Sequence, residues 1–142
     1  MTALKPGYEI FPHTADVGLS VHAKTLPELF EQAALGMTSL LTELEKIEPR
    51  EEVSFKLKAS SPETLLVDWL HEVLYQLTIK KRALGRFRVE MLKDFYLKAK
   101  ASGELLQPDR HSVFREIKAV TRHALKIEFG ERGYSVRIVF DI

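Results

Sequence analysis

The chain has 142 residues, 45% of them hydrophobic, and its 21 basic and 20 acidic side chains give a formal net charge of +1. This length predicts one compact domain over residues 1–142. The chain lacks the strong excess of basic residues that is typical of proteins that bind free nucleic acid. Because cysteine is absent, disulfides, thiolate nucleophiles and cysteine-ligated metals are excluded, and any metal must use oxygen or imidazole ligands. No apolar run approaches the roughly 18 residues of a membrane span and no signal-peptide core is present, so we expect a soluble cytoplasmic protein with no membrane partner.

The first part of the chain predicts two short strands and a helix. Apolar residues alternate over 8–11 and 19–23, which is typical of strands with one buried face. A helix is predicted to begin after Thr25, because its hydroxyl and the carboxylate of Glu28 form a capping box. Apolar side chains recur at helical spacing from there to Leu44, so one face of this helix should be buried.

A further strand and a second helix follow. Residues 53–59 alternate between apolar and polar side chains, which predicts a strand. Ser61 is the candidate N-cap of the second helix and Pro62 occupies its first position, where a missing N–H costs nothing. Its apolar face runs over 65–77, and the basic residues 80–82 are predicted to complete the last turn.

Two hairpins are predicted in the second half of the chain. Residues 87–91 and 95–101 alternate on either side of 93–94, and residues 125–129 and 136–142 flank a glycine-rich turn. Regular alternation of strand, helix and strand is absent. The sequence therefore predicts an α+β fold, mainly antiparallel β-sheet with two amphipathic helices packed on it.

The segment between the first two strands contains a histidine, a hydroxyl and a carboxylate close together. Its sequence is FPHTADVG, with His13 and Asp16 as candidate functional side chains. Loops held by a rigid sheet commonly carry functional groups. The alternative, favoured when the segment is taken alone, is an ordinary turn in which Asp16 or Thr14 bonds nearby backbone and Gly18 supplies conformational freedom.

The last strand ends in a second candidate site. Asp141 falls on the face opposite the apolar series that ends at Ile142, together with Arg137. Because the strand is apolar to its last residue, we expect Ile142 to be fixed in the core, which also fixes its terminal carboxylate. Two adjacent anionic groups need a cation or a basic side chain, and oxygen ligands favour Ca²⁺, Mg²⁺ or Mn²⁺. The alternative is a solvated terminus with Arg137 as the counter-ion.

A third cluster comprises residues 108–111 and the segment from Glu116 to Lys118. On a strand, Glu116 and Lys118 would share a face. Adjacent opposite charges are most often a solvated surface pair, and taken alone this is the favoured interpretation here.

Three widely separated motifs are more specific: HTAD at 13–16, E-x-K-A-V-T at 116–121 and the final Asp-Ile at 141–142. Together with the surrounding sequence from Tyr8 to Ile142, they resemble the archease family. The resemblance implies a small α+β accessory protein, not an enzyme, that activates the RtcB-type RNA ligase in tRNA splicing and RNA repair. It would promote guanylylation and multiple turnover of the ligase, and would meet tRNA only through it.

By the same resemblance, a metal site combines Asp16, Asp141 and Ile142. The expected cofactor is Ca²⁺, with Mg²⁺ or Mn²⁺ as alternatives. This implied site agrees with the carboxylates that the two ends of the chain supply.

The resemblance also implies further functional residues. Glu116 would lie near the site, and a basic functional position precedes it, which we place at Arg110 or His111. His13 and Lys118 are motif residues whose role is either functional or structural support.

Two other classes of function use residues of this chain. A stand-alone metal-dependent hydrolase would use the same carboxylates, although no companion general base is recognisable, and it predicts turnover by the purified protein alone.

An RNA-binding accessory module would instead use basic and aromatic side chains on exposed strand faces. The candidates are Lys56, Lys58, Lys98 and Lys100, with Tyr96 for stacking. Such a module predicts affinity for RNA that falls steeply with salt. For these lysines we favour edge protection and solubility over RNA binding.

Overall fold

The structure is a computed structural model that describes residues 6–12 and 16–142. The elements in chain order are β1 (Gly7–Pro12), β2 (Asp16–Ala23), α1 (Leu26–Leu41), the 3-10 helix η1 (Leu44–Lys46), β3 (Glu51–Lys58), α2 (Pro62–Thr78), β4 (Arg82–Lys93), β5 (Tyr96–Leu105), β6 (Ala119–Val120), β7 (Glu128–Gly130) and β8 (Gly133–Asp141). No helix among these residues is long and apolar enough to cross a membrane.

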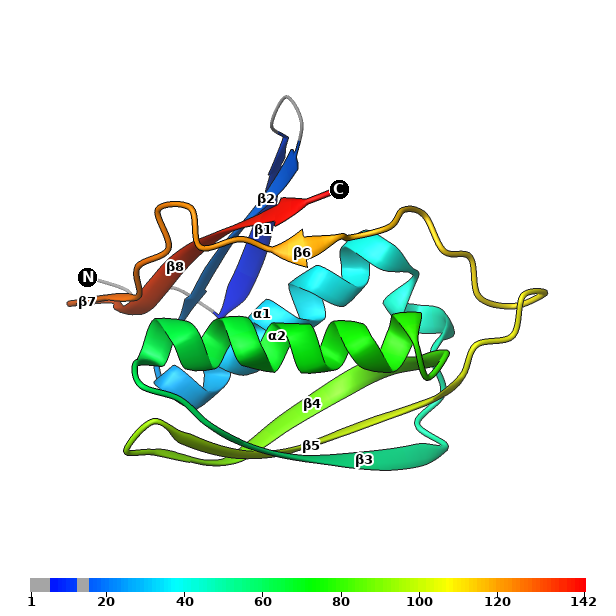
Figure 1. Cartoon of the computed structure of the whole chain (residues 1–142), viewed down its shortest axis with the longest axis horizontal. Coiled ribbons are helices and arrows are strands. Elements are labelled where there is room, and N and C mark those ends of the chain that lie inside the picture. The colour runs from blue at the N-terminus through cyan, green and yellow to red at the C-terminus, as the bar shows by residue number, and fades with distance from the viewer. Residues whose placement is uncertain (1–5, 13–15) are drawn as a thin grey trace.

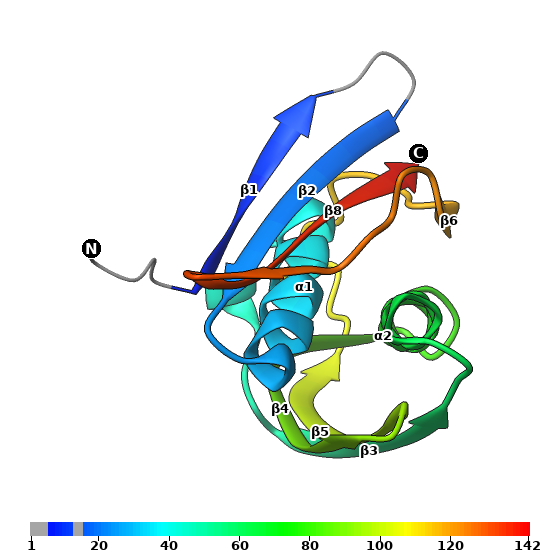
Figure 2. The same cartoon turned by 90° about the vertical axis from the view of Figure 1, so that its left-hand side faces the viewer.

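The strands form two separate antiparallel sheets with the helices between them (Figures 1 and 2). One sheet, called the terminal sheet below, has the order β1-β2-β8-β6 with β7 also paired to β8. The other, called the middle sheet, has the order β3-β5-β4. The predicted α+β class is confirmed. The division into two sheets follows from pairings between distant strands, which the alternation of side chains does not encode.

Both helices begin where the sequence predicts. The Thr25 hydroxyl accepts a hydrogen bond from the backbone N–H of Glu28 at 3.3 Å, and the Ser61 hydroxyl accepts one from that of Thr64 at 3.1 Å. These side chains satisfy N–H groups that have no partner within the first turn of a helix. The local sequence therefore sets both helix starts.

Both helices end earlier than predicted. The first ends at Leu41 and is followed by η1, so Leu44 is not part of it. The second ends at Thr78, and Lys81 adopts a left-handed conformation with φ of 55°, which turns the chain out of the helix. Residues 80–82 do not complete its last turn, because Arg82 already pairs with Leu105 at the start of β4.

The core lies between the two sheets and surrounds both helices. Trp69 of α2 is fully buried, and its indole N–H donates to the carbonyl of Phe30 in α1 at 2.9 Å. Its ring meets those of Phe55 and Phe87 from the middle sheet edge-on, with centroids 5.1 and 5.9 Å apart. Such edge contacts add to area burial in aromatic clusters. Trp69 therefore joins the two helices to the middle sheet.

The predicted hairpins are present, with different lengths. In the first, β4 and β5 turn at Asp94 and Phe95, both with positive φ, which suits a two-residue hairpin turn. In the second, β7 covers only 128–130, and a Cβ on Gly133 would lie 2.4 Å from the carbonyl oxygen of Ala23. Glycine is therefore required where this hairpin passes β2.

Candidate functional site

Asp16 and Asp141 lie opposite each other at the end of the β2–β8 ladder. The register pairs Asp16 with Asp141 and the adjacent Val17 with Phe140. Val17 and Phe140 are buried, so alternation along the strands places both carboxylates on the outer face of the terminal sheet. Asp16 is half-buried and Asp141 is exposed. Because like charges directly opposite destabilise a sheet, this end of the ladder is suited to a cation.

The pairing corrects the predicted loop of residues 11–18. Asp16 is the first residue of β2, whereas the alternation pattern had the strand begin at Leu19. Strand β8 supplies the partner that extends β2, and no local pattern reveals it. His13, the other candidate in this segment, lies outside the described residues.

The segment from Glu116 to Lys118 comes next to Asp141. The backbone N–H of Lys118 donates to the carbonyl of Asp141 at 2.7 Å, and Ala119 pairs with Asp141 in the short β6–β8 ladder. Glu116 and Lys118 are exposed on either side of the buried Ile117. A regular strand is confined to 119–120, and residues 116–118 lie outside it, although exposed and buried residues alternate there.

The expected burial of Ile142 is wrong. Val136, Ile138 and Phe140 are buried, but Ile142 is 40% exposed. The ladder ends at Asp141, which pairs with Asp16 and Ala119, and Ile142 lies one residue beyond it. The core therefore fixes the last strand through Phe140.

Arg137 is engaged away from Asp141. Its guanidinium carbon lies 4.1 Å from the centroid of the Phe11 ring, within the range of a cation–π contact. A Cβ on Gly18 would come within 1.9 Å of the same ring, so Phe11 covers Gly18 closely. Within residues 6–12 and 16–142, no ion pair involves Arg137. The structure thus gives no support to Arg137 as the counter-ion of the last strand.

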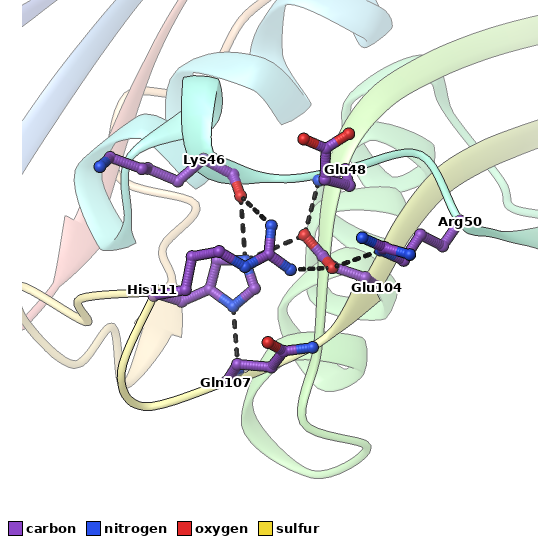
Figure 3. A network of polar contacts seen from close by, with 7 residues as sticks. Lys46, Glu48, Arg50, Glu104, Gln107 and His111 are labelled. Atoms are coloured by element: carbon purple, nitrogen blue, oxygen red, sulfur yellow. Dashed lines mark hydrogen bonds and ion pairs between the residues drawn. The ribbon is translucent and has the colours of Figure 1, made fainter.

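Arg110 and His111 belong to a different polar cluster, centred on Glu104 at the end of β5 (Figure 3). The Arg110 guanidinium pairs with one carboxylate oxygen of Glu104, and His111 Nε2 lies 3.1 Å from the other. Glu104 and His111 are both buried. Both basic candidates therefore bind a structural carboxylate and not the Asp16–Asp141 pair.

The contacts of His111 define which ring nitrogen carries the hydrogen. Its Nδ1 accepts the backbone N–H of Gln107 at 2.9 Å, so the neutral ring carries its hydrogen on Nε2. That nitrogen faces Glu104 and the carbonyl of Lys46, each at 3.1 Å. His111 thereby connects the loop after β5 to Lys46, the last residue of η1.

Glu104 is held as a carboxylate. Burial acts to raise its pKa, but hydrogen bonds from the Glu48 backbone N–H, Arg110 and His111 lower it more, to about 2. Arg50 adds a further contact at 3.2 Å. Sequence analysis missed Glu104, since a glutamate at the end of an alternating strand gives no sign that it is buried.

The side-chain oxygens of Asp16 and Asp141 are of the type that binds a hard cation. They are carboxylate oxygens, which Ca²⁺, Mg²⁺ and Mn²⁺ prefer. Throughout the described part of the chain, no group of three or more His, Asp or Glu side chains is gathered for metal binding. Because Ca²⁺ takes about six to eight oxygen ligands, these two aspartates would supply only part of its shell.

Fold and site define a class of small α+β proteins in which two neighbouring strands of one sheet, the second and the last in the chain, present paired aspartates. A family model described as the Archease protein family matches residues 8–142. Protein archease of Methanosarcina mazei is 37% identical over 139 residues, 95% of each chain. That of Sulfolobus acidocaldarius is 35% identical over 136 residues, 95% of this chain and 98% of the relative.

A solved structure gives the same result. The solution structure of Protein 1598 from Methanobacterium thermoautotrophicum superposes with a TM-score of 0.81 at 31% identity, and covers 96% of this chain and 99% of that one. The chain belongs to the archease family.

Proposed function

We propose that this protein activates an RtcB-type RNA ligase, promoting guanylylation and multiple turnover of the ligase without joining RNA itself. The observation that supports this most directly is the register that sets Asp16 opposite Asp141, with Lys118 bonded to the Asp141 backbone. Residues from all three motifs that carry the family resemblance therefore lie at one end of the terminal sheet. His13 is outside the described residues.

In this proposal, Asp16 and Asp141 hold a divalent cation, Ca²⁺ in the first place, with the carboxylate of Ile142 as a third ligand. The cation would supply positive charge beside a transferring phosphoryl group, where charge stabilisation dominates catalysis. The two strands keep both aspartates in register. Lys118, whose backbone N–H donates to the Asp141 carbonyl, and Glu116, two residues before it, would position the pair against the ligase.

The test follows covalent nucleotide on purified ligase incubated with GTP and divalent cation, with and without this protein. Wild-type protein should raise both the rate and the number of turnovers. Asp16→Asn and Asp141→Asn should each lower the stimulation by more than about tenfold, because each removes a direct ligand. Glu9→Gln is the matched control, since Glu9 is an exposed carboxylate on β1 of the same sheet.

The outcomes separate the alternatives. If wild-type protein leaves ligase guanylylation unchanged, the proposed function is wrong. If both aspartate variants stimulate the ligase as strongly as wild type does, the function stands and the metal site is wrong. Turnover of a phosphoester by the purified protein alone would favour the hydrolase alternative.

A further inference from the structure

The outer side of the middle sheet carries a concentration of basic side chains, called the basic face below. Both helices lie on the other side of this sheet, and no described element covers the basic face (Figures 1 and 2). Phe55, Val89 and Ala99 point into the core, so the residues that alternate with them point outward. The basic face consists of Arg86 and Arg88 of β4, Lys98 and Lys100 of β5, and Lys56 and Lys58 of β3. Lys93 of β4 also belongs to it, because the register shift between Val89 and Met91 sets Lys93 opposite Tyr96.

The strand register places like charges directly opposite each other on this face. Lys56 pairs with Lys98, and Arg88 pairs with Lys100. Like charges in such positions destabilise a sheet. Their presence at two adjacent places therefore calls for a reason other than the stability of the fold.

Edge protection does not provide that reason. The order β3-β5-β4 makes β5 the central strand, so Lys98 and Lys100 lie away from both edges of the sheet. Our sequence-based preference for edge protection therefore applies only to Lys56 and Lys58. For the central lysines, an anionic partner is the remaining explanation beyond solubility.

Carboxylates neutralise only part of the face. Glu52 lies 3.6 Å from Lys100, and Glu90 lies 3.4 Å from Arg88, both as solvent-exposed pairs. Such pairs are weak and are screened by salt. Within residues 6–12 and 16–142, no carboxylate is within ion-pair distance of Lys56, Lys98 or Arg86. The basic face therefore keeps a positive potential.

The face also offers a small hollow and aromatic groups. At one end, three basic side chains and one acidic one line a hollow of about 180 Å³: Arg86, Arg88, Lys100 and Glu52. At the other end, Tyr96 pairs with Lys58 across the strands, and Phe95 in the β4–β5 turn is 47% exposed. Phosphates bind to cations, and unpaired bases stack on aromatic rings.

We propose that the basic face binds single-stranded RNA directly, through its phosphate backbone, without the ligase. Basic side chains on three neighbouring strands would contact successive phosphates of the RNA, while Phe95 and Tyr96 stack on its bases. This binding goes beyond the proposed function, in which RNA contacts only the ligase. It needs neither Asp16 nor Asp141.

The test is fluorescence anisotropy of a labelled single-stranded RNA oligonucleotide with the full-length protein, in the absence of ligase. At low salt, the Kd should be of the order of 10⁻⁵ M. A plot of the logarithm of the association constant against the logarithm of the salt concentration should have a slope of about −0.7 for each phosphate contacted. The double variant Lys56→Gln/Lys98→Gln should bind at least tenfold more weakly, with a slope smaller in magnitude by about 1.4. The control Lys24→Gln/Lys126→Gln loses the same charge at exposed positions outside the middle sheet and should bind like wild type.

A stability measurement separates binding from folding. Because Lys56 and Lys98 repel each other, Lys98→Gln should melt at the same temperature as wild type or higher at low salt, and the difference should shrink at high salt. The proposal is overturned if wild-type protein does not bind the RNA, or if the control loses as much affinity as Lys56→Gln/Lys98→Gln. Binding to vesicles with anionic lipid in preference to RNA would also overturn it. Since no ligase is present, these results are independent of the proposed activation.

Discussion

Glu104 and the Asp16–Asp141 pair place carboxylates in opposite environments of one small fold. Glu104 is buried and accepts hydrogen bonds from Arg50, Arg110 and the Glu48 backbone, with His111 Nε2 beside it. Asp16 and Asp141 face each other at the end of a ladder, half-buried and exposed respectively. The first arrangement gathers several donors around one carboxylate, whereas the second sets two carboxylates opposite each other.

The difference shows what to expect of each group. A buried carboxylate with several donors stabilises the folded state, because removing it leaves those donors without an acceptor. A pair of opposed carboxylates costs stability until a cation joins them. Glu104 should therefore matter to folding and the aspartate pair to binding.

The largest effect on stability should come from Glu104→Gln. An amide retains the volume but loses the charge that Arg110 and Arg50 contact, and breaking a buried ionic group is among the most destabilising changes. We expect the melting temperature to fall by several degrees in thermal unfolding followed by circular dichroism. Glu48→Gln is the control, because it removes an exposed carboxylate and keeps the backbone N–H that Glu104 accepts. Equal melting of the two variants would contradict a structural role for Glu104.

The same carboxylate should make the protein sensitive to acid. Its pKa is lowered from 4.5 to about 2 in the folded state, so the folded protein takes up this proton less readily than the unfolded chain. Its stabilisation is complete above pH 4.5 and is lost as pH falls from there toward about 2. Chemical denaturation at a series of pH values, from about 6 down to about 2, should show a smaller acid-dependent loss of stability in Glu104→Gln than in wild type. An identical acid dependence in the two proteins would contradict the lowered pKa.

Divalent cation should stabilise the protein through the aspartate pair. A ligand that binds only the folded state at about 100 times its Kd adds about 2.7 kcal/mol. We expect Ca²⁺ to raise the melting temperature of wild type and of Glu9→Gln, but not of Asp141→Asn. A Ca²⁺ response that survives in Asp141→Asn would place the ion elsewhere.

In the absence of divalent cation, Asp141→Asn should be slightly more stable than wild type, whereas with Ca²⁺ it should be less stable. Removing one of two opposed carboxylates relieves their repulsion, so stability should rise by a few tenths of a kcal/mol, of the order of a cross-strand pair. Denaturant titration in the presence of EDTA measures this. A marked loss of stability would show that Asp141 serves the fold.

Arg137→Gln should also change stability only slightly, in the destabilising direction. It removes the contact with Phe11, which is worth about 0.5–1 kcal/mol at an exposed site. The Ca²⁺ concentration at half-saturation should stay the same, because Arg137 lies over Phe11 and not against Asp141. Calorimetric titration with Ca²⁺ checks this, and a changed affinity would restore Arg137 as the counter-ion.

The candidate site could be predicted only in part. Asp16 and Asp141 came from motifs and from alternation along the last strand, and the register confirms that they meet. The resemblance places a basic functional position at Arg110 or His111, and both side chains bind Glu104, which no pattern in the sequence marks as buried. The burial of Ile142 was wrong, since the length of a strand depends on its partner.

Local sequence patterns predict the features that depend on near neighbours along the chain. The caps at Thr25 and Ser61, the alternation in the strands and the hairpin turn at Asp94 all arise within a few residues, so local patterns predict them.

Pairing between distant segments sets the remaining features. The β2–β8 ladder sets Asp16 against Asp141, the order β3-β5-β4 puts Lys98 opposite Lys56 away from any edge, and the loop after β5 brings His111 to Glu104. These contacts join residues that are far apart in the chain or separated by an irregular turn, and no periodic pattern along the sequence encodes them.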